Sequence, residues 1–189
     1  MFISLNRQLV GAALATTAVL LLTGCGSSDD DSTASDHNKA DIMFATDMIG
    51  HHRQAVEMAV LARDRSANAE VKAIAARIEA AQGPEIEQMS GWLEDWNQPV
   101  PSMGSGHGGH GGMPGMMSDQ EMSELEATTG TAFDQRFLQL MIVHHEGAIE
   151  MAQTQQRDGK NTDAKKLAEK IEADQTAEIA EMKQLQEGE

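Results

Sequence analysis

One stretch of nineteen residues occurs twice in this chain of 189 residues, and this repeat constrains the fold more than any other feature. Residues 41–59 reappear 93 positions later as residues 134–152, with ten identical positions and no gap. The register continues into residues 78–89, whose matches with residues 171–182 include Ile78, Glu79, Glu85, Ile86 and Met89. The repeat indicates that one helical hairpin was duplicated, and that its paired histidines and its methionines were kept in both copies.

The apolar pattern predicts long helices. Aromatic residues make up only 3% of the chain and tyrosine is absent, so the core must consist mainly of Ala, Leu, Ile, Val and Met. Apolar residues recur at helical spacing over about 36–65, 68–96, 131–157 and 162–186, and Ser118 to Glu121 predicts a capped short helix before the third segment. We expect an all-α four-helix bundle over residues 37–187, built from two tandem helical hairpins. A pseudo-twofold axis would bring the two histidine pairs near each other.

The N-terminus predicts export and lipid attachment. Residues 1–24 have one arginine followed by an apolar run too short to span a bilayer comfortably, which is typical of a signal peptide. The sequence Leu22-Thr23-Gly24-Cys25 resembles a bacterial lipobox, which implies a lipid on Cys25; the alternative is an ordinary secretory signal. Residues 25–36 are expected to form a flexible tether. The predicted location is extracytoplasmic, anchored to the cell membrane by lipid.

Charge and cysteine content exclude several kinds of partner and site. The formal net charge of −16 repels nucleic acid. Cys25 is the only cysteine, and lipid attachment would consume its thiol. Neither a disulfide nor a thiolate metal site is therefore expected within one chain.

The repeated motif places candidate metal ligands on one helical face. Met48 lies one turn before His51 and His52, and the second copy repeats this trio. Thioether and neutral imidazole suit Cu(I), and imidazole also suits Cu(II) and zinc, so copper is expected and Cu(I) is favoured. The candidate ligands on the helices are Met48, His51, His52, Met58, Met141, His144, His145 and Met151.

Not every candidate on a helix can serve the same ion. Adjacent histidines diverge by about 100° on a helix, so one of each pair is expected to hydrogen-bond a neighbouring helix. The possible partners are Asp41, Asp134, Glu57 and Glu150. Met58 and Met151 lie about two turns beyond the histidines, and would serve a second site or the core.

The segment between the two halves, residues 97–117, is composed almost entirely of Gly, Met, His, Pro and Ser. It cannot bury enough side chain to order itself, which predicts a flexible loop. Its methionines and histidines resemble the tracts of copper-handling proteins, so we expect a copper-capture segment of modest affinity. The candidate ligands in this loop are Met103, His107, His110, Met113, Met116 and Met117.

The second copy of the motif also carries a family resemblance. The pattern Met-Ile-x-His-His-x-Gly-Ala-x-x-Met-Ala over residues 141–152 resembles domain-of-unknown-function family 305, and the resemblance covers about residues 37–187. It implies a ferritin-like four-helix bundle that is secreted or membrane-anchored, and some members are periplasmic copper-binding proteins linked to copper tolerance. In the first copy Gly50 and Gln54 replace Val143 and Gly147, and neither change removes a candidate ligand.

Three functions fit these patterns. The leading hypothesis is a copper-binding lipoprotein that sequesters or buffers copper without catalysis, with a delivery or efflux partner unknown. The second is a structural or interaction module whose histidines only fix the core. The third, a di-metal oxidoreductase, requires Glu-x-x-His pairs, and no glutamate lies three residues before any histidine of the repeat.

Overall fold

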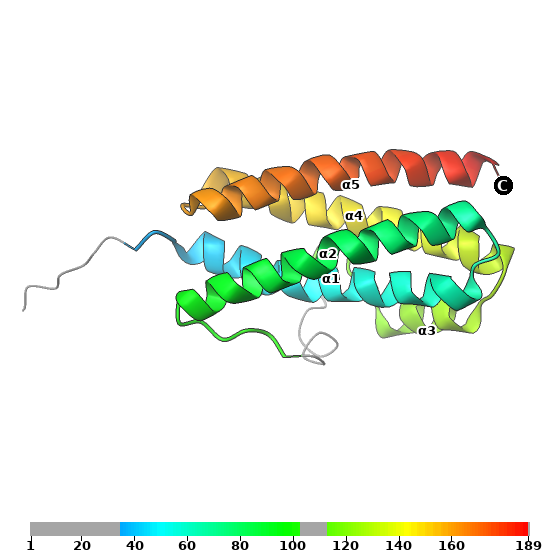
Figure 1. Ribbon diagram of the computed structural model, residues 1–189, viewed down its shortest axis with the longest axis horizontal. Coiled ribbons are helices and arrows are strands. Elements are labelled where there is room, and N and C mark those ends of the chain that lie inside the picture. The colour runs from blue at the N-terminus through cyan, green and yellow to red at the C-terminus, as the bar shows by residue number, and fades with distance from the viewer. Residues whose placement is uncertain (1–34, 103–112, 189) are drawn as a thin grey trace, which may run out of the picture. The chain divides into compact units, whose positions relative to one another are not determined.

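The structure is a computed structural model that describes residues 35–102 and 113–188, and five helices make up most of this part of the chain (Figure 1). No strand occurs within these two ranges, so the predicted all-α class is confirmed. The predicted signal peptide and most of the predicted tether lie outside the described residues, as do Cys25, Met103, His107 and His110. The helices are α1 (Lys39–Arg65), α2 (Ala69–Asp95), α3 (Asp119–Ala127), α4 (Thr131–Asp158) and α5 (Thr162–Gly188).

The four long helices form two hairpins that meet through their first helices. α1 packs along α2 and α4 packs along α5, as expected for a duplicated hairpin (Figure 1). The two hairpins contact each other mainly through α1 and α4, whereas α2 and α5 touch over a much shorter length. The short helix α3 begins with the predicted capping box between Ser118 and Glu121, and it lies against α4. All described residues belong to one compact unit, residues 34–189.

An aspartate near the start of each inner helix binds the turn of the opposite hairpin. The Asp41 carboxylate on α1 accepts the backbone N–H groups of residues 160 and 161, at 3.0 to 3.1 Å. Asp134, its repeat equivalent on α4, accepts those of residues 67 and 68, at 3.2 and 3.1 Å. Burial raises the pKa of Asp41, but the hydrogen bonds that it accepts outweigh burial and leave its pKa below the usual value. The same contact made twice ties the hairpins together at both ends.

The core consists of small and aliphatic side chains, as the composition predicts. Its aromatic centre is a stacked pair, Phe133 and Phe137, with ring centroids 5.8 Å apart. Isoleucine, leucine, methionine and alanine side chains fill the rest, and Met48, Met58 and Met141 are fully buried among them. Among the described helices, none is both long and apolar enough to cross a membrane. Midway along α1 and α4, the histidine pairs interrupt the apolar faces of the two helices.

Candidate metal centre

Four histidines are completely buried midway along α1 and α4. His51, His52, His144 and His145 each have 0% of their surface exposed. The rings of His51 and His144 lie against each other across the α1–α4 contact, with centroids 3.8 Å apart and planes inclined by 41°. Equivalent histidines of the two hairpins therefore meet, and we name His51 and His144 the central pair.

The other histidine of each copy is bound within its own hairpin. His52 Nε2 lies 2.8 Å from Glu85 Oε2 on α2, and His145 Nε2 lies 2.7 Å from Glu178 Oε2 on α5. Both contacts span 33 residues, so the two copies of the repeat make the same hydrogen bond. A carboxylate that holds one imidazole nitrogen fixes the ring orientation and makes the other nitrogen a better metal ligand.

The expected partners of these histidines were wrong, although the expected hydrogen bond to a neighbouring helix is present. Asp41 and Asp134 bind the turns of the opposite hairpins, and Glu57 and Glu150 are exposed. The true partners lie on the second helix of each hairpin. The repeat contained the signal for them, because Glu85 and Glu178 are identical positions in the same register.

The two carboxylates differ in one respect. Glu85 Oε1 also accepts a hydrogen bond from Lys170 Nζ at 2.9 Å, across the α2–α5 contact. Burial raises the pKa of Glu85, but His52 and Lys170 outweigh it and hold the pKa below the usual value. Glu85 is therefore a carboxylate that accepts, and His52 donates its Nε2–H to it.

Burial keeps His51, His52 and His144 neutral. Desolvation, followed by repulsion from His52, lowers the pKa of His51 to about 3. Desolvation and the neighbouring imidazoles also lower the pKa of His144 well below its usual value. The pKa of His52 is lowered as well, because desolvation outweighs the attraction of Glu85. Neutral imidazole is the form that binds metal ions.

Each of these imidazoles has a buried ring nitrogen without a hydrogen-bond partner. His51 donates its Nε2–H to the carbonyl oxygen of Pro114 at 3.1 Å, which leaves its Nδ1 unpartnered. The Nδ1 atoms of His52 and His145 are also unpartnered, and His144 has no partner at either nitrogen. Buried polar atoms are rarely left in this state, because losing hydration without a replacement is costly. The histidine cluster therefore has unused donor atoms suited to a ligand.

The histidine cluster alone does not form a complete metal site of imidazole, thiolate or carboxylate ligands. Among residues 35–102 and 113–188, no three His, Cys, Asp or Glu side chains converge in a way that could hold a metal ion. Met48 and Met141 are fully buried one helical turn before the histidines. The donor set at the centre is therefore imidazole and thioether, which matches a soft cation.

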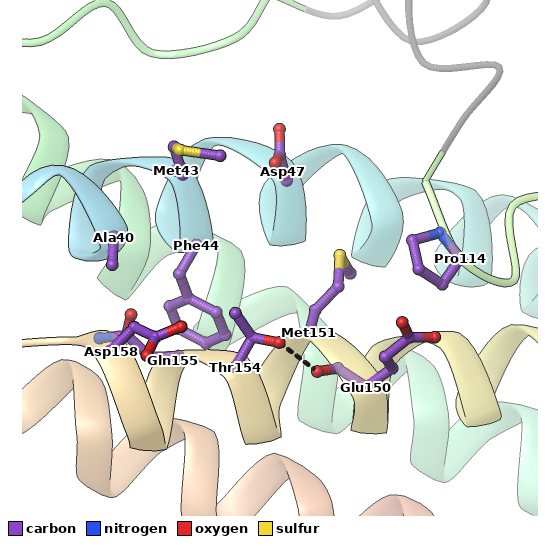
Figure 2. A pocket seen from close by; sticks show the side chains of 10 residues that line it. All are labelled: Ala40, Met43, Phe44, Asp47, Pro114, Glu150, Met151, Thr154, Gln155 and Asp158. Carbon is purple, nitrogen blue, oxygen red and sulfur yellow. Dashed lines mark hydrogen bonds between the residues drawn. The ribbon is translucent and has the colours of Figure 1, made fainter.

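The remaining helical methionines lie away from the central pair. Met58 is fully buried in an apolar cluster and serves the core. Met151 is half-buried and lines a groove of about 350 Å³ between α1 and α4. Figure 2 shows the Met151 side chain reaching from α4 into this groove, between Phe44 and Pro114. The structure thus separates these two methionines from the trios, in agreement with the spacing.

The end of the Met/His loop crosses the histidine cluster. We name residues 113–117 the strap; within it, Met113 and Met116 are half-buried and Met117 is buried. The side chain of Gln54 on α1 donates to the carbonyl oxygen of Met117 at 2.9 Å and accepts its N–H at 2.7 Å. Sequence reasoning missed Gln54 as well as Pro114. The visible signal was that Gln54 departs from the repeat.

Known proteins place the chain in a family with this fold. The family model for the domain of unknown function DUF305 matches residues 41–186. No protein of curated function matches the chain. A crystal structure of a DUF305 protein from Streptomyces coelicolor is 38% identical with a TM-score of 0.70, covering 77% of this chain and 91% of that one. A DUF305 fragment from Deinococcus radiodurans is 29% identical with a TM-score of 0.72, covering 80% and 98%.

The chain is also similar to a copper-bound protein. CopM in its Cu(II)-bound form is 34% identical with a TM-score of 0.69, covering 78% of this chain and 96% of CopM. Cu(I)-bound and silver-bound structures of CopM match as well. The family match spans most of the chain, and the fold and the paired histidines agree with the resemblance seen in the sequence. The chain belongs to the DUF305 family.

Proposed function

We propose that this protein is an extracytoplasmic, lipid-anchored copper-binding protein that sequesters or buffers copper and catalyses no reaction. Cu(I) is the favoured form, and Cu(II) or zinc are the alternatives. The lipobox-like sequence at Cys25 supports the location and the anchor. The ions would be held by the histidine cluster of α1 and α4, with the Met/His loop as a second, weaker binding segment.

One observation carries the proposal: the central pair is buried and neutral, and three of its four ring nitrogens have no hydrogen-bond partner. His51 Nδ1 and both ring nitrogens of His144 lack hydrogen-bond partners, while the two rings lie 3.8 Å apart. A histidine that only fixed a core would be hydrogen-bonded through at least one ring nitrogen, and His144 is bonded through neither. Imidazole nitrogens without partners, one helical turn from buried thioethers, suit Cu(I) better than any other common ion.

The copper-bound structures of CopM support the same reading. CopM is described in Cu(I)-bound and Cu(II)-bound forms, and it shares the fold and about a third of the aligned residues with this chain. We infer a shared capacity for copper. We assign the buffering role because the residues around the central pair are suited to binding a metal ion.

The test is an anaerobic Cu(I) titration in competition with bicinchoninate. The wild-type protein is compared with the double variant His51→Leu/His144→Leu, in which the loop ligands are intact. His37→Gln is the matched control, because His37 stacks on Trp96 near the start of α1, far along the helix from the central pair. Circular dichroism confirms that each variant is folded.

We expect the double variant to lose at least one tight equivalent of Cu(I), and the His37→Gln variant to lose none. A double variant with the wild-type stoichiometry and affinity would contradict the helical site. Such a result would leave the alternative of a structural module whose histidines fix the core.

A further inference from the structure

The strap is a tight turn laid across the central pair. Met116 donates its N–H to the Met113 carbonyl at 3.4 Å, with Pro114 and Gly115 at the two central positions. Gly115 has φ of 75°, which is the conformation that the third residue of a type II turn requires. The turn points the Pro114 carbonyl at His51 Nε2, 3.1 Å away. The strap therefore occupies one nitrogen of the central pair directly.

Gly147 on α4 is the floor of the strap. The turn lies directly against it, and only glycine leaves enough space for this contact. A Cβ atom on Gly147 would lie 2.1 Å from the Pro114 carbonyl oxygen and 2.7 Å from the Gly115 Cα. A Cβ on Gly115 would lie 2.6 Å from the Val143 carbonyl oxygen. The two backbones are thus in direct contact, one turn beyond the central pair.

α1 provides a clamp at the other end of the strap. The Gln54 side-chain amide exchanges two hydrogen bonds with the backbone of Met117, at 2.9 and 2.7 Å, and its own side chain is buried. Together with the bond from His51, these contacts hold the strap closed.

The strap explains why the two copies of the repeat differ beside the histidines. Gln54 and Gly147 occupy equivalent positions in the two copies. A single strap that crosses a pair of equivalent helices cannot contact both in the same way. One copy supplies the clamp and the other supplies the floor, so this pair of positions diverged while the histidines did not.

We propose that the strap is the gate through which an ion reaches the central pair, with Gln54 and Gly147 as its positioning residues. This inference rests on the proposed function, because it concerns how copper reaches that site. His51 and His144 have no exposed surface, so some part of the molecule must move to admit an ion. The strap is the non-helical segment packed over them, and it opens by breaking a few hydrogen bonds, whereas parting α1 from α4 would disrupt the core. Opening also releases His51 Nε2 from Pro114.

The first test measures access without any metal. Diethyl pyrocarbonate modifies accessible neutral imidazoles, and peptide fragmentation assigns the label to individual histidines. The Gln54→Ala variant loses two hydrogen bonds, each worth roughly fivefold in an equilibrium constant, so the open population should rise about 25-fold. We expect His51 and His144 to be labelled faster by about that factor. Gln155→Ala is the control, since Gln155 is also buried and hydrogen-bonded, to Asp41, away from the strap.

A second variant acts on the strap from the opposite side. Gly147→Ala would push Pro114 away from α4, because the new methyl group would overlap with it. The helix itself should be unaffected, because alanine is a good helix former. Gly91→Ala on α2 is its matched control, because nothing lies within 4 Å of a Cβ at that position. We expect faster labelling of the central pair in Gly147→Ala and unchanged labelling in Gly91→Ala.

The same four variants are then mixed with Cu(I) delivered as its bicinchoninate complex, and the rate of copper transfer is followed by absorbance. Faster transfer in Gln54→Ala and Gly147→Ala, together with faster labelling, would support the gate. Labelling at the wild-type rate in both strap variants would overturn it, whether or not copper binds. If labelling accelerates but no variant binds copper, the strap controls access as inferred, and it is the proposed function that fails.

Discussion

His144 is buried with both ring nitrogens unpartnered, and this gives the most revealing substitution in the protein. If the residue is kept for an ion, then in the absence of that ion it weakens the fold. A buried polar atom without a partner costs about 1–3 kcal/mol. Replacing His144 with leucine, which has a similar volume, removes that cost. We expect His144→Leu to stabilise the metal-free protein by about 1–2 kcal/mol at pH 7, after a small allowance for changed packing.

His52 provides the matched comparison, because it is equally buried but its Nε2 lies 2.8 Å from Glu85 Oε2. Hydrogen bonds to charged groups are worth about 1.5–3 kcal/mol, so His52→Leu should destabilise the protein by about 2 kcal/mol. Urea denaturation followed by circular dichroism, with a chelator present, gives both free energies of unfolding. The two leucine variants are thus predicted to have opposite signs.

Copper should reverse the order of stability of the wild-type protein and His144→Leu. A ligand that binds only the folded state stabilises it by about 2.7 kcal/mol when its concentration is 100 times its dissociation constant. The wild-type protein should gain this stability with Cu(I), and His144→Leu should gain much less. If His144→Leu destabilises the metal-free protein as much as His52→Leu does, the ring of His144 has partners after all, and the reasoning is refuted.

Three further predictions follow from the same contacts. The pKa of His51 is lowered to about 3 in the folded state, and the pKa values of His52 and His144 are lowered as well, so the unfolded chain binds more protons than the folded protein below pH 6.5. Between pH 7 and pH 5 the metal-free protein should lose about 2 kcal/mol of stability through His51 alone in urea titrations, and a pH-independent stability would contradict the neutral burial of these histidines. Asp41→Ala should lower the free energy of unfolding by about 3 kcal/mol. Asp134→Ala should lower it by about 2 kcal/mol, because one oxygen of Asp134 has no partner. If both variants cost close to zero, the two turns keep their structure without the aspartates. Glu85→Gln should weaken Cu(I) binding about tenfold in competition titrations by loosening His52, whereas unchanged affinity would mean that His52 is not a ligand.

Much of the fold was predictable because the repeat is strong and local rules agree with it. Helical spacing, the Ser118 capping box and the duplicated hairpin led to four long helices and one short one, all present in the described residues. A pseudo-twofold axis also predicted that the two histidine pairs approach each other, but the structure was needed to show that His51 and His144 are the ones that meet.

The partners of the histidines were harder to predict because they depend on how helices cross. Candidate carboxylates were sought on the helices that carry the histidines, whereas Glu85 and Glu178 lie 33 residues away on the second helix of each hairpin. The contact requires the exact rotation of two packed helices, which hydrophobic spacing leaves undetermined. A search for repeated polar residues in the second helix would have found it.

The strap was not predictable, because composition describes residues 97–117 as one flexible loop. Its last residues become ordered through contacts with two helices at once: the clamp at Gln54 and the floor at Gly147. Neither a glutamine nor a glycine on a helix indicates a functional role from the sequence alone. Only the arrangement in space shows that the mismatch between the two copies has a physical reason.

The most direct test of the copper site is a crystal of the Cu(I)-loaded protein, grown without oxygen and measured on both sides of the copper absorption edge. An anomalous peak bonded to ring nitrogens of His51 and His144, with a thioether from Met48 or Met141 as a further ligand, is the predicted result. Copper peaks confined to the loop or the surface, with the central pair unoccupied at saturating Cu(I), would contradict the account.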